Sequence, residues 1–158
     1  MRRAEQLRYL VLAAQREGNR QLLHALAPLS LTPSQAEVLR IVGDYAPLSV
    51  SALGGLLVCE SGTNPSRLVE RLVTAGLILR QSEPGDRRQV ALSLTDAGRA
   101  AEASVREIEE ALYASIDGVL SGSTADTADL LELLRRLTAG SPSGRAYGNR
   151  VTGIPKRR

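Results

Sequence analysis

The chain has 158 residues, which suits one compact domain, and a formal net charge of +3 from 20 basic and 17 acidic side chains. It has no run of 18 apolar residues, so no transmembrane helix and no membrane association are expected. Its charged N-terminal stretch does not resemble a secretory signal, so we expect a cytoplasmic protein. A single cysteine excludes an internal disulfide.

The core composition and the placement of charge narrow the class of protein further. The chain has no Phe or Trp and only four Tyr, so its core must be aliphatic, a composition that favours long helices. Residues 140–158 carry five basic side chains and no acid, which leaves a net charge of −2 for the rest of the chain. A nucleic-acid-binding surface would therefore depend on local clusters of basic residues and not on bulk charge.

Two helices are predicted at the start of the chain. Apolar residues recur at helical spacing through residues 4–27, and Pro28 marks the end of this segment. The next helix has the clearest start signal in the sequence. Thr32 can cap it, Pro33 suits its first position, and Gln35 completes a capping box.

The middle of the chain predicts a helix-turn-helix. A third helix is expected to begin after Ser49 or Ser51. A turn at 59–62 separates it from a fourth helix over residues 63–75, which ends at Gly76. Two short helices joined by a tight turn are the central unit of many DNA-binding domains.

A β-hairpin is predicted directly after these helices. Residues 77–81 have the pattern of a strand, and residues 89–94 alternate polar and apolar side chains as a half-buried return strand does. The segment between them, residues 83–88, contains adjacent Pro and Gly and predicts the turn. Such a hairpin would form the wing of a winged helix-turn-helix.

Two further helices follow the hairpin. Thr95 is expected to cap a long helix, and five leucines fall in a last helix over residues 125–138. The helices over 4–27, 95–117 and 125–138 are rich in Leu and Ala, and they flank a lobe too small to cover them all. A two-fold dimer would bury these helices, so a homodimer is predicted.

The predicted fold is therefore mainly α with a small β-hairpin wing. One domain is expected over residues 1–139. Its winged helix-turn-helix spans about 32–94, and dimerisation helices span about 4–28 and 95–139. Residues 140–158 are poor in apolar side chains and are expected to form a disordered basic tail. This tail could add non-specific affinity for DNA or serve only as a solubilising end.

The start of the fourth helix carries polar side chains suited to DNA. In a helix-turn-helix the second helix enters the major groove, and its N-terminal residues meet the base edges. Asn can pair with adenine and Arg with guanine, whereas Ser and Thr suit phosphates or either base. The predicted contacts are Thr63, Asn64, Ser66 and Arg67, with Arg71 one turn later near a phosphate. The alternative is an ordinary capped helix with a polar outer face.

The predicted turn of the hairpin carries two arginines. A guanidinium from Arg87 or Arg88 can enter the minor groove, where the negative potential is strongest at narrow segments. Asp86 cannot bind phosphate directly, so its expected role is to support Arg88 or the hairpin backbone. The alternative is a solvated turn with an incidental ion pair.

Several stretches of the chain resemble the MarR family of bacterial regulators. Residues 86–98 are similar to the wing signature of that family, which is Asp-x-Arg, five residues, then Leu-Thr-x-x-Gly. Residues 31–35 resemble the start of the helix that precedes its helix-turn-helix. Residues 66–72, followed by Gly-Leu-Ile at 76–78, resemble its recognition helix. The resemblance covers about residues 5–139.

The resemblance implies the fold and activity of that family. Its members are homodimers whose first, fifth and sixth helices interleave and carry two DNA-binding lobes. They bind pseudo-palindromic operators, commonly as repressors released by phenolic or other aromatic ligands or by oxidation. On this chain Arg88 would contact the minor groove with Asp86 as its support, and the polar residues at the start of the fourth helix would face the major groove. Pro65 departs from the usual helix residue, so base preference is not transferred.

Few residues in the sequence are candidates for sensing an oxidant or binding a small ligand. Cys59 follows Leu57 and Val58, a setting typical of a small buried cysteine, and the peroxide-sensing relatives carry their reactive cysteine near the start of the chain. Redox sensing is therefore the less favoured role for Cys59. A ligand cavity between the first helix and the DNA-binding lobe has four candidate lining residues, although packing is the favoured role of each: Tyr9, His24, Tyr45 and Tyr113.

Two classes of function are compatible with the sequence. The first is a ligand-responsive regulator that binds double-stranded DNA, and the second is a protein-interaction module with the same fold and no sequence-specific DNA contact. Asn64, Arg67 and Arg88 favour the first, because an interaction module would not need polar groups at all three positions. The sequence shows no nucleophile–base pair, phosphate-binding glycine loop or metal cluster, so no enzyme, cofactor or metal is expected.

Overall fold

The computed structural model describes residues 1–58, 64–83 and 86–153, with the backbone alone for 82, 83 and 86–90. In chain order its elements are α1 (Arg3–Leu26), the 3-10 helix η1 (Ala27–Leu29), α2 (Pro33–Tyr45), β1 (Leu48–Ser49), α3 (Val50–Gly54), α4 (Pro65–Thr74), β2 (Ile78–Glu83), β3 (Asp86–Leu94), α5 (Asp96–Ser121), α6 (Thr127–Thr138) and α7 (Pro142–Thr152). The predicted fold class, mainly α with a small wing, is confirmed.

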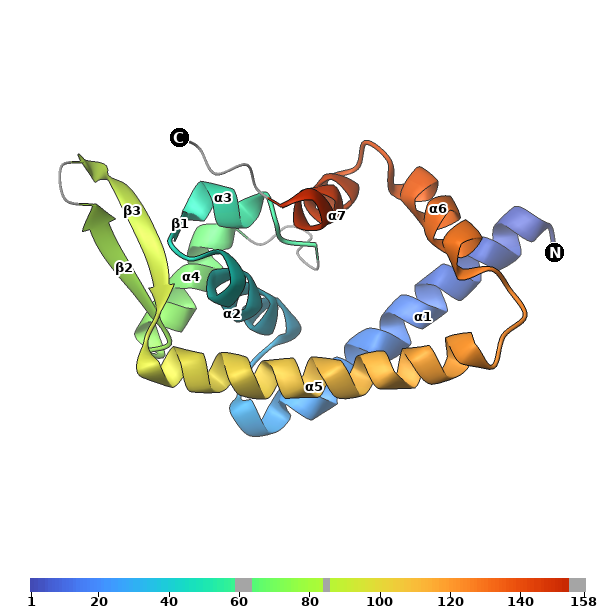
Figure 1. The fold of residues 1–158 in the computed structure, drawn as a ribbon, viewed down its shortest axis with the longest axis horizontal. Helices are drawn as coiled ribbons and strands as arrows, with labels where there is room; N and C mark the ends of the chain where they lie inside the picture. The colour runs from blue at the N-terminus through green and yellow to red at the C-terminus, as the bar shows by residue number, and fades with distance from the viewer. Residues whose placement is uncertain (59–63, 84–85, 154–158) are drawn as a thin grey trace.

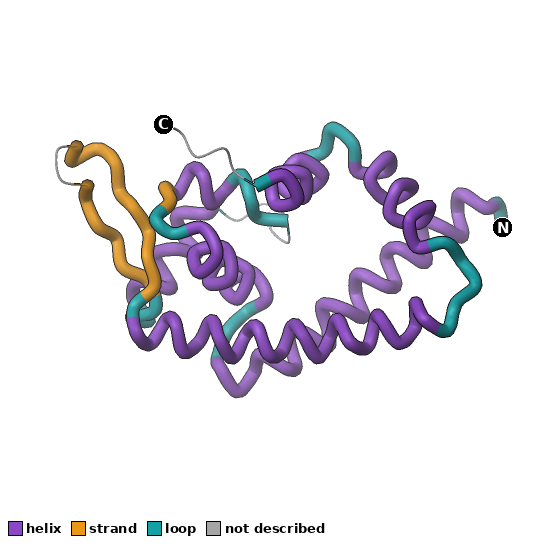
Figure 2. Tube along the Cα trace, in the orientation of Figure 1, coloured by secondary structure: helices purple, strands orange, loops and turns teal. Residues whose placement is uncertain are grey.

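The molecule has two ends joined by one long helix. Figure 1 shows the β2–β3 hairpin at one end beside α2, α3 and α4, whereas α6 and the N-terminal half of α1 lie at the other. Helix α5 runs between these ends. Figure 2 shows that the end away from the hairpin is almost entirely helical. Among the residues that the structure describes, no helix combines the length and apolarity needed to cross a membrane.

The helix starts follow the capping signals of the sequence. At α2 the Thr32 hydroxyl accepts a hydrogen bond from the Gln35 amide at 3.3 Å, and the Gln35 side chain accepts one from the Thr32 amide at 2.9 Å. At α5 the Thr95 hydroxyl accepts from the Gly98 amide at 2.8 Å. These bonds satisfy amides that have no partner within their own helix, which is why the sequence located both starts correctly.

The hydrophobic core lies in the lobe at the hairpin end. Helix α2 forms its centre and buries Val38, Leu39 and Val42. Aliphatic side chains from α1, α3 and the turn after it, α4, the sheet and α5 surround them. The fully buried ones are Leu26, Leu53, Leu56, Val69, Leu72, Ile78, Leu92 and Val105. The core is aliphatic, as the composition predicts.

The sheet is larger than the predicted hairpin. Its strand order is β1-β3-β2, and the two-residue β1 pairs antiparallel with β3 through Leu48 and Leu92. This strand was not predicted because two residues carry no periodicity. The hairpin strands are also longer than expected, so Asp86 to Arg88 begin β3 and do not form the turn. The register is irregular between Ser82 and Glu83.

A cluster of charged side chains joins α2 to α5. Arg40 of α2 donates to the Glu109 carboxylate at 2.9 Å and also forms an ion pair with Glu102. Arg106 donates to Glu102 at 2.7 Å and to Asp44 at 3.1 Å. Burial opposes the charge of Arg40, but its hydrogen bonds to Glu109 and Glu102 outweigh this effect and raise the pKa of the guanidinium. The cluster fixes the lobe on the long helix.

The expectation of disorder after residue 140 is wrong for most of that segment. Residues 142–152 form α7, which begins at Pro142 behind a Ser141 cap and packs back onto the lobe. Composition predicted disorder because this segment is poor in apolar residues. Helix α7 has only one buried apolar side chain, Ala146, and polar contacts hold it on the lobe instead. Residues 154–158, the rest of the predicted tail, lie outside the described residues.

Candidate nucleic-acid interface

Helix α4 presents a polar face whose opposite side is anchored in the core. Leu68, Val69 and Leu72 are buried, whereas Arg67 and Arg71 are exposed. The two arginines are four residues apart and therefore lie on the same side of the helix. Their guanidinium groups face solvent on a rigid element, as contacts to DNA require.

The first predicted base contacts are also the residues that cap α4. The Asn64 side-chain oxygen accepts a hydrogen bond from the Ser66 amide at 2.9 Å, and Pro65 occupies the first helical position. One lone pair of the Asn64 oxygen thus serves the helix, which leaves its amide N–H groups and its second lone pair for a base. Ser66 is partly buried. Thr63, predicted beside them, lies outside the described residues.

Substitutions at Asn64 separate capping from DNA recognition. Asn64→Ala removes the cap and is expected to lower the free energy of unfolding by about 1 kcal/mol. Asn64→Ser keeps a capping oxygen, so its stability should stay near that of the wild type while any adenine-specific contact is lost. Urea unfolding and DNA binding of both variants check this. Equal DNA affinity of the Ser variant and the wild type would show that Asn64 acts only as a cap.

The wing stands beside α4 at the end of the molecule (Figure 1). Asp86, Arg87 and Arg88 occupy the first three positions of β3, and the turn at 84–85 lies outside the described residues. The structure thus brings the backbone of the predicted wing residues to the same lobe as Arg67 and Arg71. It describes the side chains of the two arginines on α4 but not those of residues 86–88.

A tight junction joins the wing to α5. The Thr95 hydroxyl donates to the Gly76 carbonyl at 2.7 Å, and the Thr95 amide donates to the Leu77 carbonyl at 3.1 Å. Gly98 lies against that same carbonyl: a Cβ atom at Gly98 would be 1.9 Å from the Leu77 oxygen. The Leu-Thr-x-x-Gly pattern therefore has a physical basis, because it ties the end of α4, the base of the wing and the start of α5 together.

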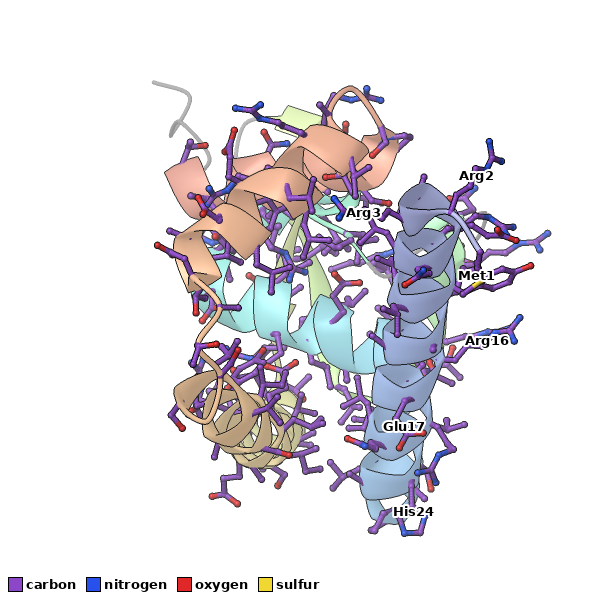
Figure 3. All side chains as sticks on the ribbon, turned by 90° about the vertical axis from the view of Figure 1, so that its right-hand side faces the viewer. Met1, Arg2, Arg3, Arg16, Glu17 and His24 are labelled. Carbon is purple, nitrogen blue, oxygen red and sulfur yellow. The ribbon has the colours of Figure 1, made fainter. Side chains whose placement is uncertain are left out.

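The four predicted ligand-binding residues do not form one cluster. Tyr9 and His24 are 15 residues apart on the continuous helix α1, which places them about 22 Å apart. Both are exposed, and Figure 3 shows His24 at the end of α1 opposite Met1. Tyr9 instead stacks with Arg8, whose guanidinium carbon is 5.3 Å from the ring centroid.

Tyr45 contacts α7, whereas Tyr113 lies on α5, one turn after Glu109. The Tyr45 hydroxyl donates to the Arg150 carbonyl at 3.5 Å. Burial, together with the charge of Glu109, raises the pKa of the Tyr113 hydroxyl, and the charges of Arg40 and Arg150 act in the opposite direction. Within the part of the chain that the structure describes, no three side chains of the metal-binding types come together. Cys59, considered above for redox sensing, lies outside the described residues.

The contacts that α7 makes with the lobe are not apparent from the sequence. Glu37 of α2 is buried, with 6% of its surface exposed, and it accepts a hydrogen bond from Arg150 at 2.5 Å. A start signal for α7 was present in the Ser141–Pro142 pair, which has the same form as the Thr32–Pro33 pair that begins α2. The partners of Arg150 had no local signal, since 113 residues separate it from Glu37.

Comparison with known proteins places this geometry among transcriptional regulators. Residues 31–98 match the winged helix DNA-binding domain. The organic hydroperoxide resistance transcriptional regulator of Bacillus subtilis is 33% identical over 98 residues, covering 62% of this chain and 66% of that protein. TtmR of Methylorubrum extorquens is 37% identical over 94 residues, covering 60% of this chain and 48% of TtmR. The aligned region thus spans about half to two thirds of these two relatives.

A third relative matches over nearly its whole length. The transcriptional regulator MgrA of Staphylococcus aureus is 31% identical over 134 residues, covering 84% of this chain and 86% of MgrA. Among solved structures, a MarR mutant from E. coli in complex with operator DNA has a TM-score of 0.67 at 27% identity, covering 84% of this chain and 93% of that one. The repressor CouR bound to a 23-mer DNA duplex has a TM-score of 0.63 at 30% identity, covering 75% and 89%.

Proposed function

The chain belongs to the MarR family of DNA-binding transcriptional regulators, and we propose that it represses transcription as a homodimer on a pseudo-palindromic operator. The observation that carries this proposal is the pairing of an exposed Arg67–Arg71 face on a capped α4 with a wing whose second strand starts at Asp86, both on one lobe. A helix of this kind suits the major groove, and arginines on an adjacent wing suit the minor groove.

Each predicted contact has a proposed role in this complex. The helix residues that would face the major groove are Thr63, Asn64, Ser66 and Arg67, and Arg71 would contact a phosphate. Arg88 would enter the minor groove, with Arg87 beside the phosphates and Asp86 as the support of the wing. Operator selectivity would arise mainly from Asn64, Arg67 and Arg88, since these side chains can distinguish bases or groove width.

Dimerisation is supported by the apolar side chains left exposed at the end of the molecule away from the wing. A single chain rarely leaves many large apolar residues in contact with water, and a row of them marks an interface. Those on α1, α5 and α6 include Leu10, Val11, Leu12, Ile116, Val119, Leu130, Leu131, Leu133 and Leu137. A two-fold axis through these helices would place two copies of α4 about 34 Å apart, which is one turn of DNA.

Release by a small ligand is the second part of the proposal. A compound that binds between α5 and the lobe would change the distance between the two recognition helices, and that distance sets operator affinity. Tyr45 and Tyr113 are the predicted residues best placed to contact an aromatic compound there, because Tyr45 ends α2 of the lobe and Tyr113 lies on α5. A thermal-shift screen with simple phenols and aromatic carboxylates tests this part. A rise in melting temperature together with weaker DNA binding would support it.

Selection of bound duplexes from random DNA tests the proposed function directly. The wild type is expected to enrich an inverted repeat whose half-sites are about one helical turn apart. Sedimentation of the free protein should give twice the mass of one chain. If no sequence is enriched, the protein-interaction module becomes the better description.

Arg88→Ala is the sharpest single test of the wing. The variant is expected to bind the selected duplex about 5- to 150-fold more weakly, because one groove contact contributes about 1–3 kcal/mol. Arg136→Ala is the matched control: Arg136 is exposed on α6 and pairs with Glu132, away from the wing. Gel-shift titration of both variants measures the difference. Unchanged binding of Arg88→Ala would contradict the assignment of Arg88 to the groove.

A further inference from the structure

Helix α7 returns from the far end of the molecule and contacts the segment that leads into the recognition helix. The Asn149 side-chain amide donates to the Gly55 carbonyl at 2.9 Å, and Arg150 Nε donates to the Leu56 carbonyl at 2.8 Å. A second nitrogen of Arg150, Nη2, donates to the Glu37 carboxylate at 2.5 Å. Two neighbouring residues of α7 therefore hold two consecutive carbonyls of the helix-turn-helix.

These carbonyls lie where the short helix α3 ends. The last carbonyl groups of a helix lack partners within that helix, and basic side chains at this end are favourable. Helix α3 has only five residues and cannot by itself fix the direction of the chain that follows it. The contacts from Asn149 and Arg150 supply partners at this point, ahead of the connection to α4.

The buried carboxylate of Glu37 completes the network. It accepts from the Val58 amide at 2.7 Å as well as from Arg150, so it links α2, the segment 55–58 and α7. A carboxylate with 6% of its surface exposed is stabilised by such charge-assisted hydrogen bonds. Removal of the Arg150 charge would weaken the attachment of residues 55–58 to α2 as well as to α7.

Helix α7 is itself held in place by close packing. The Ser141 hydroxyl caps it, and Gly144 lies so near the end of α6 that a Cβ atom there would be 2.2 Å from the Thr138 carbonyl oxygen. Ala146 is buried, and the Tyr45 hydroxyl donates to the Arg150 carbonyl at 3.5 Å. The helix is thus attached both to α6 and to the lobe.

We propose that α7 is a clamp that positions the recognition helix, with Arg150 and Asn149 as its positioning residues. The Arg150 guanidinium serves Glu37 and the Leu56 carbonyl, so it acts through the protein and not by contact with a phosphate. The proposal rests on the proposed operator binding and adds the element that orients α4 for it. Base contacts need an accurately placed helix, whereas phosphate contacts tolerate displacement.

The salt dependence of DNA binding distinguishes a positioning residue from a phosphate contact. Arg150→Met is expected to weaken binding to the duplex selected by the wild type by about tenfold, as it would if only about a tenth of the molecules kept the competent arrangement. Binding to a scrambled duplex should change less than about twofold, and the slope of log affinity against log salt should not change. A lost phosphate contact would instead weaken both duplexes and reduce the slope by about 0.9.

Arg145→Met is the matched control for charge. Arg145 lies on the same helix and carries the same charge, but it donates within its own segment to the Gly140 carbonyl at 2.5 Å. Wild-type affinity for both duplexes is expected in this variant. An equal loss in Arg145→Met and Arg150→Met would overturn the proposal, because it would show that the charge of α7 acts on DNA directly.

A second pair of variants tests the clamp without removing charge. Gly144→Ala should displace α7 because its new Cβ meets the Thr138 carbonyl, whereas Gly148→Ala meets no atom within 4 Å and should leave α7 in place. Only the first is expected to weaken binding of the selected duplex. Equal binding by both variants and the wild type would overturn the proposal.

Hydrogen exchange keeps this test independent of the proposed function. In Arg150→Met and Gly144→Ala, the amide of Val58 is expected to exchange faster, because its acceptor Glu37 is no longer held by α7. Arg145→Met should exchange like the wild type. Unchanged protection of Val58 would overturn the clamp even if operator binding is confirmed. If instead the wild type enriches no duplex while protection of Val58 falls as expected, the proposed operator binding fails and the clamp stands as a structural feature.

Discussion

Gly98→Ala is expected to lower the free energy of unfolding by about 3 kcal/mol or more, an effect at or above the upper end for an overpacked site. A Cβ atom at this position would be 1.9 Å from the Leu77 carbonyl oxygen, and that oxygen belongs to the backbone and cannot rotate away. The same oxygen accepts the Thr95 amide at 3.1 Å. The start of α5 must therefore move away from the base of the wing.

The effect of Gly98→Ala is best measured against Gly118→Ala on the same helix. A Cβ atom added at Gly118 would have no other atom within 4 Å. Alanine there should therefore raise the free energy of unfolding by up to about 1 kcal/mol, because alanine has the higher helix propensity. Thermal unfolding at one fixed protein concentration should show Gly98→Ala lower by about 6–12 °C and Gly118→Ala equal to the wild type or higher. Two alanine variants of equal stability would contradict the junction described here.

Gly98→Ala is expected to weaken DNA binding as well as to lower stability. The junction formed by Gly76, Leu77 and Thr95 is where α4, the wing and α5 meet. A displaced α5 changes the direction in which the lobe leaves the proposed dimer. We therefore expect the folded fraction of Gly98→Ala to bind the selected duplex more weakly than the wild type.

The parts of the fold predicted correctly from the sequence are those with local causes. Thr32 and Thr95 were identified as caps because a cap depends on residues within one helical turn. The hairpin was predicted from adjacent strand patterns, and the aliphatic core from composition. Each of these signals can be evaluated from neighbouring residues without knowledge of the tertiary structure.

The parts that were missed depend on contacts between distant residues. Strand β1 exists because Leu48 pairs with Leu92, and nothing in its two residues signals that pairing. Helix α7 is poor in apolar side chains and is held on the lobe by Arg150 and Asn149, whose partners lie 94 or more residues away in the sequence. Composition alone predicted disorder, because composition cannot show that a charged side chain has a buried partner.

In the candidate site, too, features with local signals were predicted from the sequence and features that depend on tertiary contacts were not. A helix was expected over residues 63–75 and α4 spans Pro65–Thr74, but the use of the Asn64 oxygen as a cap became apparent only from its bond to Ser66. The wing residues Asp86 and Arg88 were placed in a turn, whereas the structure places them in β3. Their contacts with DNA remain predictions, as do the dimer and its ligand.

Arg40→Met, in the charged cluster between α2 and α5, is expected to lower the free energy of unfolding by about 2–3 kcal/mol. Removing one partner of a fully buried ion pair costs about 3–5 kcal/mol, and this cluster is partly hydrated. The Arg40 side chain is 18% exposed, and its partners Glu102 and Glu109 are 12% and 19% exposed. Glu102 keeps its contact with Arg106 in the variant, so Glu109 accounts for most of the loss.

A double-mutant cycle isolates that contribution. If the bond between Arg40 and Glu109 is the main loss, combining Arg40→Met with Glu109→Gln should cost about 1–2 kcal/mol less than the sum of the two single changes. Arg20→Met serves as the control. The Arg20–Glu17 pair lies on the surface, with side chains 72% and 50% exposed, so its loss should leave the unfolding midpoint in urea unchanged. Purely additive effects would contradict a direct coupling of Arg40 to Glu109.

The same variant tests how the lobe is coupled to the rest of the molecule. Arg40 lies on α2, at the centre of the DNA-binding lobe, while Glu102 and Glu109 lie on the helix that leads to the proposed dimer interface. Loss of the cluster should therefore let the lobe move on α5 while the dimer persists. Sedimentation of Arg40→Met should show an unchanged mass, and its affinity should fall for the selected duplex more than for a scrambled one. An equal fall for both duplexes would mean that the cluster supports folding alone and does not set the orientation of α4.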